Sequence, residues 1–271
     1  MHMADTPVKA GVLTAAPRSL CAPMRRSVAP SCCLETDTPI DRPDLAIYSQ
    51  AERFAAGVQP TWNNPDITTN LVGANKLMPE ASVRVRNNSA TASAIAANVC
   101  CFVSRFGIGY DRQPIDNSTQ NFAPGEQREL LIPFPQAVLN GDQRIGFHVR
   151  IEHPTDPTLI NNTGSQILDP YTTSAQGRSI ATSFLVRNPL AASQTIQVEQ
   201  LATEPGIDAS FAIASGAFGP LEERTCQVEI DVEAWLTGAP SNFVRRDITY
   251  VARGTDGNVI DGLTFMVWVD S

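Results

Sequence analysis

The chain has few of the residues on which enzymes most often depend. Only three histidines occur among its 271 residues, at positions 2, 148 and 153. The sequence also lacks the GxSxG, HExxH, P-loop and EF-hand patterns, so no established catalytic motif is present. A Ser-His-Asp or Cys-His arrangement would have to use His148 or His153. The alternation of residues 144–152 predicts that His148 faces solvent beside Glu152. We therefore expect no enzyme, no catalytic residue and no cofactor.

Long hydrophobic runs are missing too. No segment approaches the roughly 20 apolar residues that a membrane helix requires. The apolar segment Ala10–Ala16 is too short for the core of a signal peptide. We therefore expect no membrane insertion, and a location in the cytoplasm or in an assembled particle. Basic charge is scarce as well, with a net charge of -8 and a pI near 4.9. This balance argues against nucleic acid as a partner, because binding phosphates requires a clustered basic surface.

Cysteines do not form the pattern of a disulfide-stapled sandwich. The six cysteines include two adjacent pairs and no position that recurs along the chain. Reduced thiols are the prediction. Neighbours on a strand point to opposite faces, so one of Cys100 and Cys101 should lie in the core and the other should face outward. A metal site at Cys32 and Cys33 is conceivable, but no CxxC pair or histidine at ligand spacing accompanies it.

The chain repeats itself about 100 residues apart. Val85-Arg86-Asn87 closes one alternating run, and Val186-Arg187-Asn188 closes a second run 101 residues later. Ala123-Pro124-Gly125-Glu126-Gln127-Arg128 opens an apolar strand, and Gly219-Pro220-Leu221-Glu222-Glu223-Arg224 opens another 96 residues later. This period suits two sandwiches of roughly 100 residues each.

The predicted fold class is all-β, with two tandem immunoglobulin-like sandwiches after an extended arm. Residues 1–43 are rich in proline and show no sustained period, so they form either a disordered tail or an arm that orders against a neighbouring subunit. The first sandwich spans residues 44–163 and the second spans 178–271. The Gly-, Ser-, Thr- and Gln-rich residues 164–177 are predicted to be a linker.

Local signals support this organisation. Thr255-Asp256-Gly257-Asn258 has the Asp-Gly pair of a hairpin turn. The glycines of residues 106–110 predict a bend or bulge, since the helix that follows a phosphate-binding loop is missing. Residues 66–77 could hold a short helix. Further strands are predicted at 82–86, 96–105, 130–134, 144–152, 195–200, 210–214, 225–232, 247–253 and 263–269.

Several polar and aromatic residues allow a second interpretation. Asp156, Asn161, Asn162 and Asp169 could offer oxygen ligands to calcium, although polar loops commonly have this composition without a metal, and none is predicted. Three glycosylation acceptor patterns are explained as simply by turns: Asn87-Asn88-Ser89, Asn117-Ser118-Thr119 and Asn161-Asn162-Thr163. The aromatic residues that could form a carbohydrate platform or a protein interface are equally suited to the rim of a core: Trp62, Trp235 and Phe243.

The order of these motifs resembles bacterial immunoglobulin-like modules of the CARDB type. The resemblance is carried by Val83-Arg84-Val85-Arg86-Asn87, by Phe122-Ala123-Pro124-Gly125-Glu126, and by Arg150 to Pro157 before Asn161-Asn162. A more divergent second module would contain Asn188 and Arg224, so that the two modules cover residues 44–270. The resemblance implies the sandwich fold and says little about activity, because such sandwiches host many roles.

These observations predict a structural or interaction protein. Two sandwiches and a pliable arm suit protein-protein contacts within a larger bacterial or phage-like assembly, through self-assembly or with other proteins. The alternative is a secreted or surface adhesion or carbohydrate-binding accessory module, in which carbohydrate would be the ligand. Unpaired edge strands would be plausible contact surfaces, since their free backbone groups can pair with another chain.

Overall fold

The computed structural model describes residues 41–70, 80–133, 144–173, 179–201, 205–213, 216–232 and 243–270. Residues 37–271 make one compact unit. Strands account for most of the described residues, so the predicted all-β class is confirmed. Nearly all of the predicted N-terminal arm lies outside the described residues.

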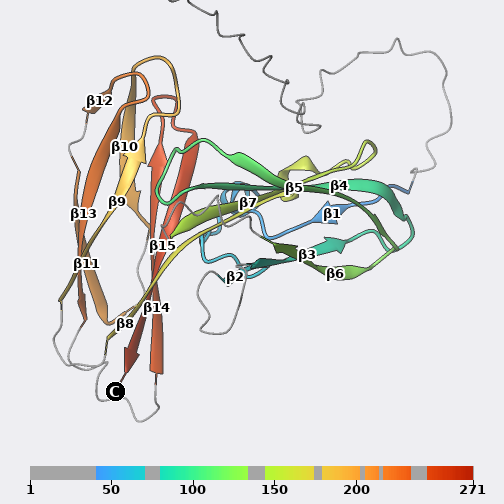
Figure 1. Cartoon of the computed structure of the whole chain (residues 1–271), viewed down its shortest axis with the longest axis horizontal. Coiled ribbons are helices and arrows are strands. Elements are labelled where there is room, and N and C mark those ends of the chain that lie inside the picture. Colours follow the sequence, from blue (N-terminus) through green and yellow to red (C-terminus); the bar gives the residue numbers. More distant parts are fainter. Residues whose placement is uncertain are drawn as a thin grey trace, which may run out of the picture. The chain divides into compact units, whose positions relative to one another are not determined.

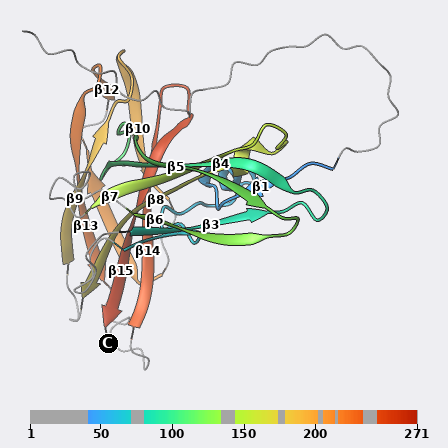
Figure 2. The same cartoon turned by 45° about the vertical axis from the view of Figure 1, so that its right-hand side comes forward.

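The first sheet has β3 at its centre. This strand pairs antiparallel with β6 along one side and with β1 and β2 along the other. The burial of β3 alternates, with Val83 and Val85 fully buried and Arg84 exposed, as a strand covered on one face should show. The strands are β1 (Leu45–Ala46), β2 (Ile67–Asn70), β3 (Glu80–Asn87) and β6 (Gln127–Pro133). In both views β3 and β6 lie below β4 and β5 (Figures 1 and 2). The short helix considered for residues 66–77 is not present over 67–70, which form β2.

The second sheet has eight strands in the order β12-β10-β14-β15-β8-β7-β4-β5 (Figure 1). All neighbours pair antiparallel except β8 and β15, which are parallel. The strands are β4 (Ala94–Arg105), β5 (Gln113–Phe122), β7 (Ile145–Glu152), β8 (Thr163–Thr173), β10 (Gln194–Gln200), β12 (Gly216–Phe218), β14 (Phe243–Arg253) and β15 (Val259–Asp270). The predicted hairpin turn is confirmed between β14 and β15, where Gly257 has a φ of +77°.

The third sheet has β13 in the middle, flanked by β11 and β9, and Figure 1 labels all three strands. Its strands are β9 (Ser179–Arg187), β11 (Ile207–Ala212) and β13 (Glu223–Val232). Every second residue of β13 is buried from Cys226 to Val232, so one face of the sheet meets the core.

In the described part of the chain, helical structure is confined to two short elements beside β8. Helix α1 (Gln50–Ala55) begins after Ser49, whose side chain accepts a hydrogen bond from the Glu52 backbone N–H at 3.3 Å. The 3₁₀ turn η1 (Leu159–Asn161) leads directly into β8.

The eight-stranded sheet buries opposite faces in its two halves. Phe147 and Val149 of β7 belong to a first core shared with β3 and β6. On β8, Ile167 lies opposite Gly146, the neighbour of Phe147, so it points to the other face. Ile167 belongs to a second core, formed with β9, β13, β14 and β15. The sheet therefore changes its buried face near β8.

The predicted linker is in large part a strand. Residues 163–173 form β8, which pairs with β7 on one side and with β15 on the other. The prediction over these residues was wrong because their polar side chains find partners inside the protein: Gln166 accepts a hydrogen bond from the Asn64 backbone N–H at 2.5 Å, and the Ser165 hydroxyl bonds to His148. Residues 174–178 of the predicted linker lie outside the described residues.

The repeat in the sequence is matched by a repeated set of contacts. The Asn87 side-chain amide donates to the carbonyl oxygens of Ala92 and Ala123, at 2.8 and 3.0 Å. The Asn188 amide likewise donates to Ala192 and Gly219, at 2.8 and 2.7 Å. Each buried asparagine thus fixes the turn that follows its own strand to a second turn from later in the chain.

A glutamate and an arginine complete each copy. Glu126 accepts hydrogen bonds from the Ala123 backbone N–H at 2.7 Å and from Arg128 Nε at 2.9 Å. These contacts lower the pKa of Glu126, with the backbone N–H as the larger cause. The equivalent contacts of Glu222 come from Arg224 Nε and the Gly219 backbone N–H, and Arg224 is the larger cause of its lowered pKa. In each copy the arginine also lies over a phenylalanine, with Arg128 on Phe122 and Arg224 on Phe218.

Candidate functional site

His148 lies in the interior and not on the solvent face that its alternation predicted. Its side chain is 1% exposed, and its ring nitrogens lie 2.9 Å from the Ser104 hydroxyl and 2.8 Å from the Ser165 hydroxyl. Burial, together with the positive charge of Arg112, holds the pKa of this ring well below its usual 6.5. The prediction failed because alternation separates the two faces of a strand but does not show whether the second face is also covered.

The other members of the predicted histidine cluster have separate partners. His153 lies 3.1 Å from the Ile95 carbonyl oxygen through Nε2 and 3.2 Å from the Thr155 hydroxyl through Nδ1. Glu152 forms an ion pair with Arg150 at 2.8 Å. Among the described residues, His148 is thus held by hydroxyl groups and has no carboxylate partner of the kind found in a catalytic triad.

The cysteines differ in part from expectation. Cys101 and Cys226 are free, buried thiols, and burial raises the pKa of each to about 12. Cys100 is disulfide-bonded, so the prediction of reduced thiols is wrong for this residue. Spacing in the sequence could not show this, because cysteine pairing depends on the fold. Cys100 is also only 1% exposed, so both members of the pair are buried and neither faces outward as one was predicted to do. The remaining cysteines lie outside the described residues: Cys21, Cys32 and Cys33.

Three of the four residues considered as calcium ligands lie together. The Asn162 amide donates to Asp156 Oδ2 at 3.2 Å, and the neighbouring Asn161 amide donates to Asp44 Oδ1 at 3.0 Å. Asp156 Oδ2 also accepts from the Leu45 backbone N–H at 2.9 Å, which brings Asp44 and Asp156 into one cluster. Asp44 was not recognised from the sequence because it is more than 100 residues away along the chain. Asp169 is elsewhere, on β8, paired with Arg144 at 3.2 Å.

The glycine-containing segment 106–110 crosses from the first half of the chain to β9. The Ile108 backbone N–H donates to the Leu185 carbonyl oxygen, and the Ile108 carbonyl accepts from the Arg187 N–H, each at 2.9 Å. A Cβ on Gly109 would lie 2.2 Å from the Arg187 carbonyl oxygen, and its φ of +82° is also unsuited to other residues. The predicted bend is therefore a place of close backbone approach. We call this pairing the seam.

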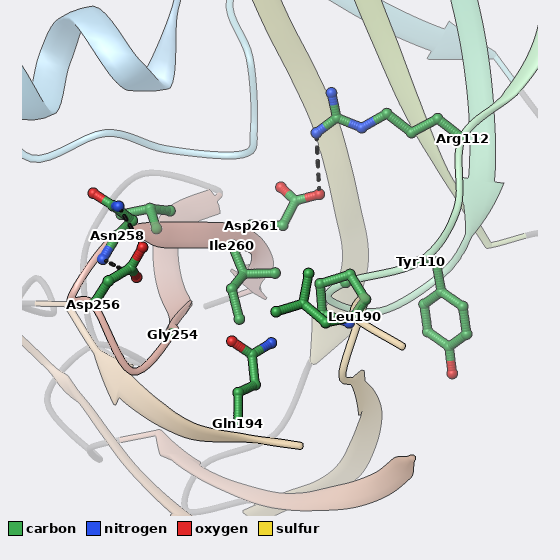
Figure 3. Close-up of a pocket in the computed structure, with 12 residues that line it drawn as sticks. Tyr110, Arg112, Leu190, Gln194, Gly254, Asp256, Asn258, Ile260 and Asp261 are labelled. Carbon is green, nitrogen blue, oxygen red and sulfur yellow. Dashed lines mark hydrogen bonds and ion pairs between the residues drawn. The ribbon is translucent and has the colours of Figure 1, made fainter. Parts of the chain in front are cut away.

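A hollow of about 270 Å³ opens beside the seam. Leu190, Ile260 and the amide of Gln194 converge on it, and Asp256 is held to Asn258 at its rim (Figure 3). The lining residues come from the segment after β4, from the turn before β10 and the first residue of β10, and from the β14–β15 turn and the start of β15.

Asp261 forms the polar floor of this hollow. Its carboxylate accepts a hydrogen bond from Trp62 Nε1 at 2.8 Å. The same carboxylate lies 3.6 Å from Arg112 (Figure 3). Burial raises the pKa of Asp261, and Arg112 and the hydrogen-bond donors oppose that shift. The Trp62 backbone N–H also donates to the Thr264 hydroxyl at 2.9 Å. Trp62 and Arg112 therefore bind the first half of the chain to β15.

The aromatic and glycosylation candidates from the sequence differ in their exposure. Trp62 is 2% exposed, so it does not form a platform for carbohydrate. Trp235 and the side chain of Phe243 lie outside the described residues. Among the glycosylation patterns, Asn87 and Asn161 are buried at 2% and 3% exposure, whereas Asn117 is exposed on β5.

Two strands at sheet edges are candidate contact surfaces within the described part of the chain. Strand β5 pairs only with β4 there, and β6 pairs only with β3. Strand β5 is ten residues long, and eight of its first nine residues are polar or proline. Leu131 of β6 is 66% exposed. Alternation did not predict β5, because neither of its faces is apolar.

No family model and no curated protein matches the chain. Among solved structures, it is similar to a protein of unknown function from Porphyromonas gingivalis W83, with 13% identity over 76% of this chain and 100% of the other, at a TM-score of 0.25. It is similar to the CupB6 tip adhesin from Pseudomonas aeruginosa, with 8% identity over 83% and 95% of the chains and a TM-score of 0.22. A bacterial adhesin from Mobiluncus mulieris gives 9% identity over 76% and 98%, with a TM-score of 0.21. Similarities of this size do not decide the family or the function. Among the described residues, no helix is long and apolar enough to cross a membrane.

Proposed function

We propose that this chain is a non-enzymatic structural protein that makes protein-protein contacts in a larger bacterial or phage-like assembly. In this proposal two immunoglobulin-like modules of the CARDB type follow an N-terminal arm. They keep the expected bounds of residues 44–163 and 178–271, except that the first module extends through β8. The support is the strand order, in which β5-β4-β7-β8 and β12-β10-β14-β15 are equivalent four-stranded halves of one sheet. The duplicated asparagine and glutamate contacts add to this support.

The observation that carries the proposal is the way the two halves are joined. Strand β8 pairs with both halves, the seam adds backbone hydrogen bonds, and Trp62 adds side-chain hydrogen bonds. A flexible hinge between modules requires few contacts across the junction. This junction instead has strand pairing, backbone hydrogen bonds and side-chain hydrogen bonds along it. Such a joint holds the surfaces of both halves at a fixed spacing, which a building unit requires and a flexible tether does not.

A non-enzymatic role is supported by the state of His148. The ring is buried and kept neutral, and both of its nitrogens have hydroxyl partners. Its hydrogen bonds connect β4, β7 and β8, which is a structural task. Substituting His148 and His153 together by glutamine should leave the association properties of the folded protein unchanged.

The free edge of β5 is the contact surface that we propose to test. Lysine at an edge strand opposes strand addition, because the new strand would bury its charge. We expect the full-length chain to show masses above 29.2 kDa by light scattering, and the double variant Asn117→Lys/Thr119→Lys to lose this association. A matched control, Thr225→Lys/Gln227→Lys, places the same charges on β13, a central strand with both edges paired.

The outcomes separate clearly. Loss of association in the β5 variant, with retention in the β13 control, supports the edge as the contact. A wild-type protein that remains at 29.2 kDa at every concentration, and in extracts of its source, would refute the assembly proposal.

A further inference from the structure

We propose that Asp44, Asp156, Asn161 and Asn162 form a binding site for a hard divalent cation, with calcium as the ion that fits best. Asp44 precedes β1, Asp156 lies in the loop after β7, and the two asparagines lie where η1 passes into β8. The proposal is independent of the assembly role.

Two buried oxygens without partners point to a ligand. Asn161 and Asn162 are 3% and 2% exposed, and the Oδ1 atom of each is buried and makes no hydrogen bond. A buried amide oxygen without a partner loses the free energy of its hydration and gains nothing in return. Both unpaired oxygens belong to amides that are already held against the two carboxylates.

The orientation of these amides is the one expected when no cation is bound. Each amide directs its nitrogen to a carboxylate, because an oxygen in that position would meet negative charge. The two ends of an amide are nearly equal in size, so a half-turn of the terminal group exchanges them. A cation among the carboxylates would reverse the preference and draw the amide oxygens inward. The same change would give the two unpaired oxygens a ligand, at the expense of the hydrogen bonds that the amide nitrogens now donate to the carboxylates.

The ligand set favours calcium over smaller ions. Carboxylate and amide oxygens are the groups that calcium takes, usually six to eight of them, whereas magnesium demands a stricter octahedron and keeps its waters. Asp156 already accepts hydrogen bonds from the backbone N–H groups of Leu45 and Thr158, which fixes its carboxylate but leaves it a lone pair. Asp44 is less buried and receives a long hydrogen bond of 3.4 Å from Asn88. Water would complete the coordination shell on that side.

Only two carboxylates contribute, so the affinity should be modest. No group of three acidic, histidine or cysteine side chains at metal-binding distance occurs among the described residues. We expect a dissociation constant of about 10⁻⁴–10⁻³ M, the range of extracellular calcium modules. Calcium at ~20 times this constant should shift the unfolding equilibrium roughly 20-fold. For a chain of this size that shift is ~4–7 °C in Tm.

The test uses the full-length chain, with thermal unfolding and calorimetric titration in calcium chloride. Asp44→Asn removes one charge at a partly exposed position and should weaken calcium binding at least ~10-fold. Asn161→Asp adds a carboxylate, so it should lower Tm without calcium, by like-charge repulsion, and tighten calcium binding. Asp256→Asn, in the β14–β15 hairpin, is the matched control and should bind as the wild type does.

The Asn161→Asp variant distinguishes a cation site from a purely structural cluster. In a structural cluster the added charge destabilises the protein, and calcium restores nothing. The proposal is overturned if calcium raises the Tm of neither wild type nor Asn161→Asp above matched sodium chloride. It is also overturned if Asp256→Asn reduces binding as much as Asp44→Asn does. Equal effects of magnesium and calcium would contradict the choice of calcium.

Discussion

The buried histidine makes the stability of the protein depend on pH in a defined window. The pKa of His148 is held well below 6.5 in the folded state, chiefly by burial. When the chain unfolds, the ring regains its ordinary pKa and takes up a proton as pH falls, while the folded state does not. The stabilisation is therefore complete above about pH 7 and is lost as pH falls below 6.5 towards the folded pKa.

The size of this loss follows from proton linkage. If the folded ring stays neutral, the free energy of unfolding should fall by ~0.8 kcal/mol at pH 6 and by ~2 kcal/mol at pH 5, relative to neutral pH. We would measure urea unfolding from pH 5 to 8 for wild type and His148→Gln, by tryptophan fluorescence. The variant should be less stable at neutral pH, since the Ser104 and Ser165 hydroxyls lose a partner. Its free energy of unfolding should, however, no longer show the loss at low pH that protonation of His148 causes in the wild type.

His153→Gln is the matched control, because this histidine is partly exposed. Its free energy of unfolding should decline below pH 6.5 in the same way as that of the wild type. Parallel pH profiles for wild type and His148→Gln would refute the reasoning, as would disappearance of the decline in His153→Gln.

Three further predictions concern stability and can be checked by chemical denaturation. Gly109→Ala should lower the free energy of unfolding by at least ~2 kcal/mol, since its Cβ would clash with the Arg187 carbonyl oxygen. Gly125→Ala has nothing within 4 Å of its Cβ, so it should lose only the ~1 kcal/mol of a positive φ. Equal losses in the two variants would contradict the close approach at the seam. Asn188→Ala should cost ~2–4 kcal/mol, because two buried carbonyl groups lose their donor. Trp62→Phe should cost ~1–3 kcal/mol by leaving Asp261 short of a donor; unchanged stability would show that this hydrogen bond does not matter.

Sequence patterns predicted the elements whose two faces differ. The alternation of β13 and the Asp-Gly turn before β15 were sufficient, because burial on one face and turn chemistry are local properties. The offsets of 101 and 96 residues located the repeated segments, and the structure then showed that their asparagines and glutamates make equivalent contacts.

Elements that depend on distant partners escaped prediction. Strand β8 has the composition of a linker, and its strand character comes from pairing with β7 and β15. His148 has the period of an exposed residue but is enclosed by side chains from β4 and β8. Asp44 entered the candidate cation site only through folding, since its partner Asn161 is 117 residues away. Such placements are tertiary, so a single sequence without its fold could not show them.

The most direct test of the central claim is the mass of the native particle that contains this chain, purified from its source without a tag. Light scattering and negative-stain imaging would give its mass and its regularity. If the chain is a subunit of an assembly, the particle should be large and regular, with the chain as a repeated or fixed component. A free particle near the chain mass of 29.2 kDa would contradict it.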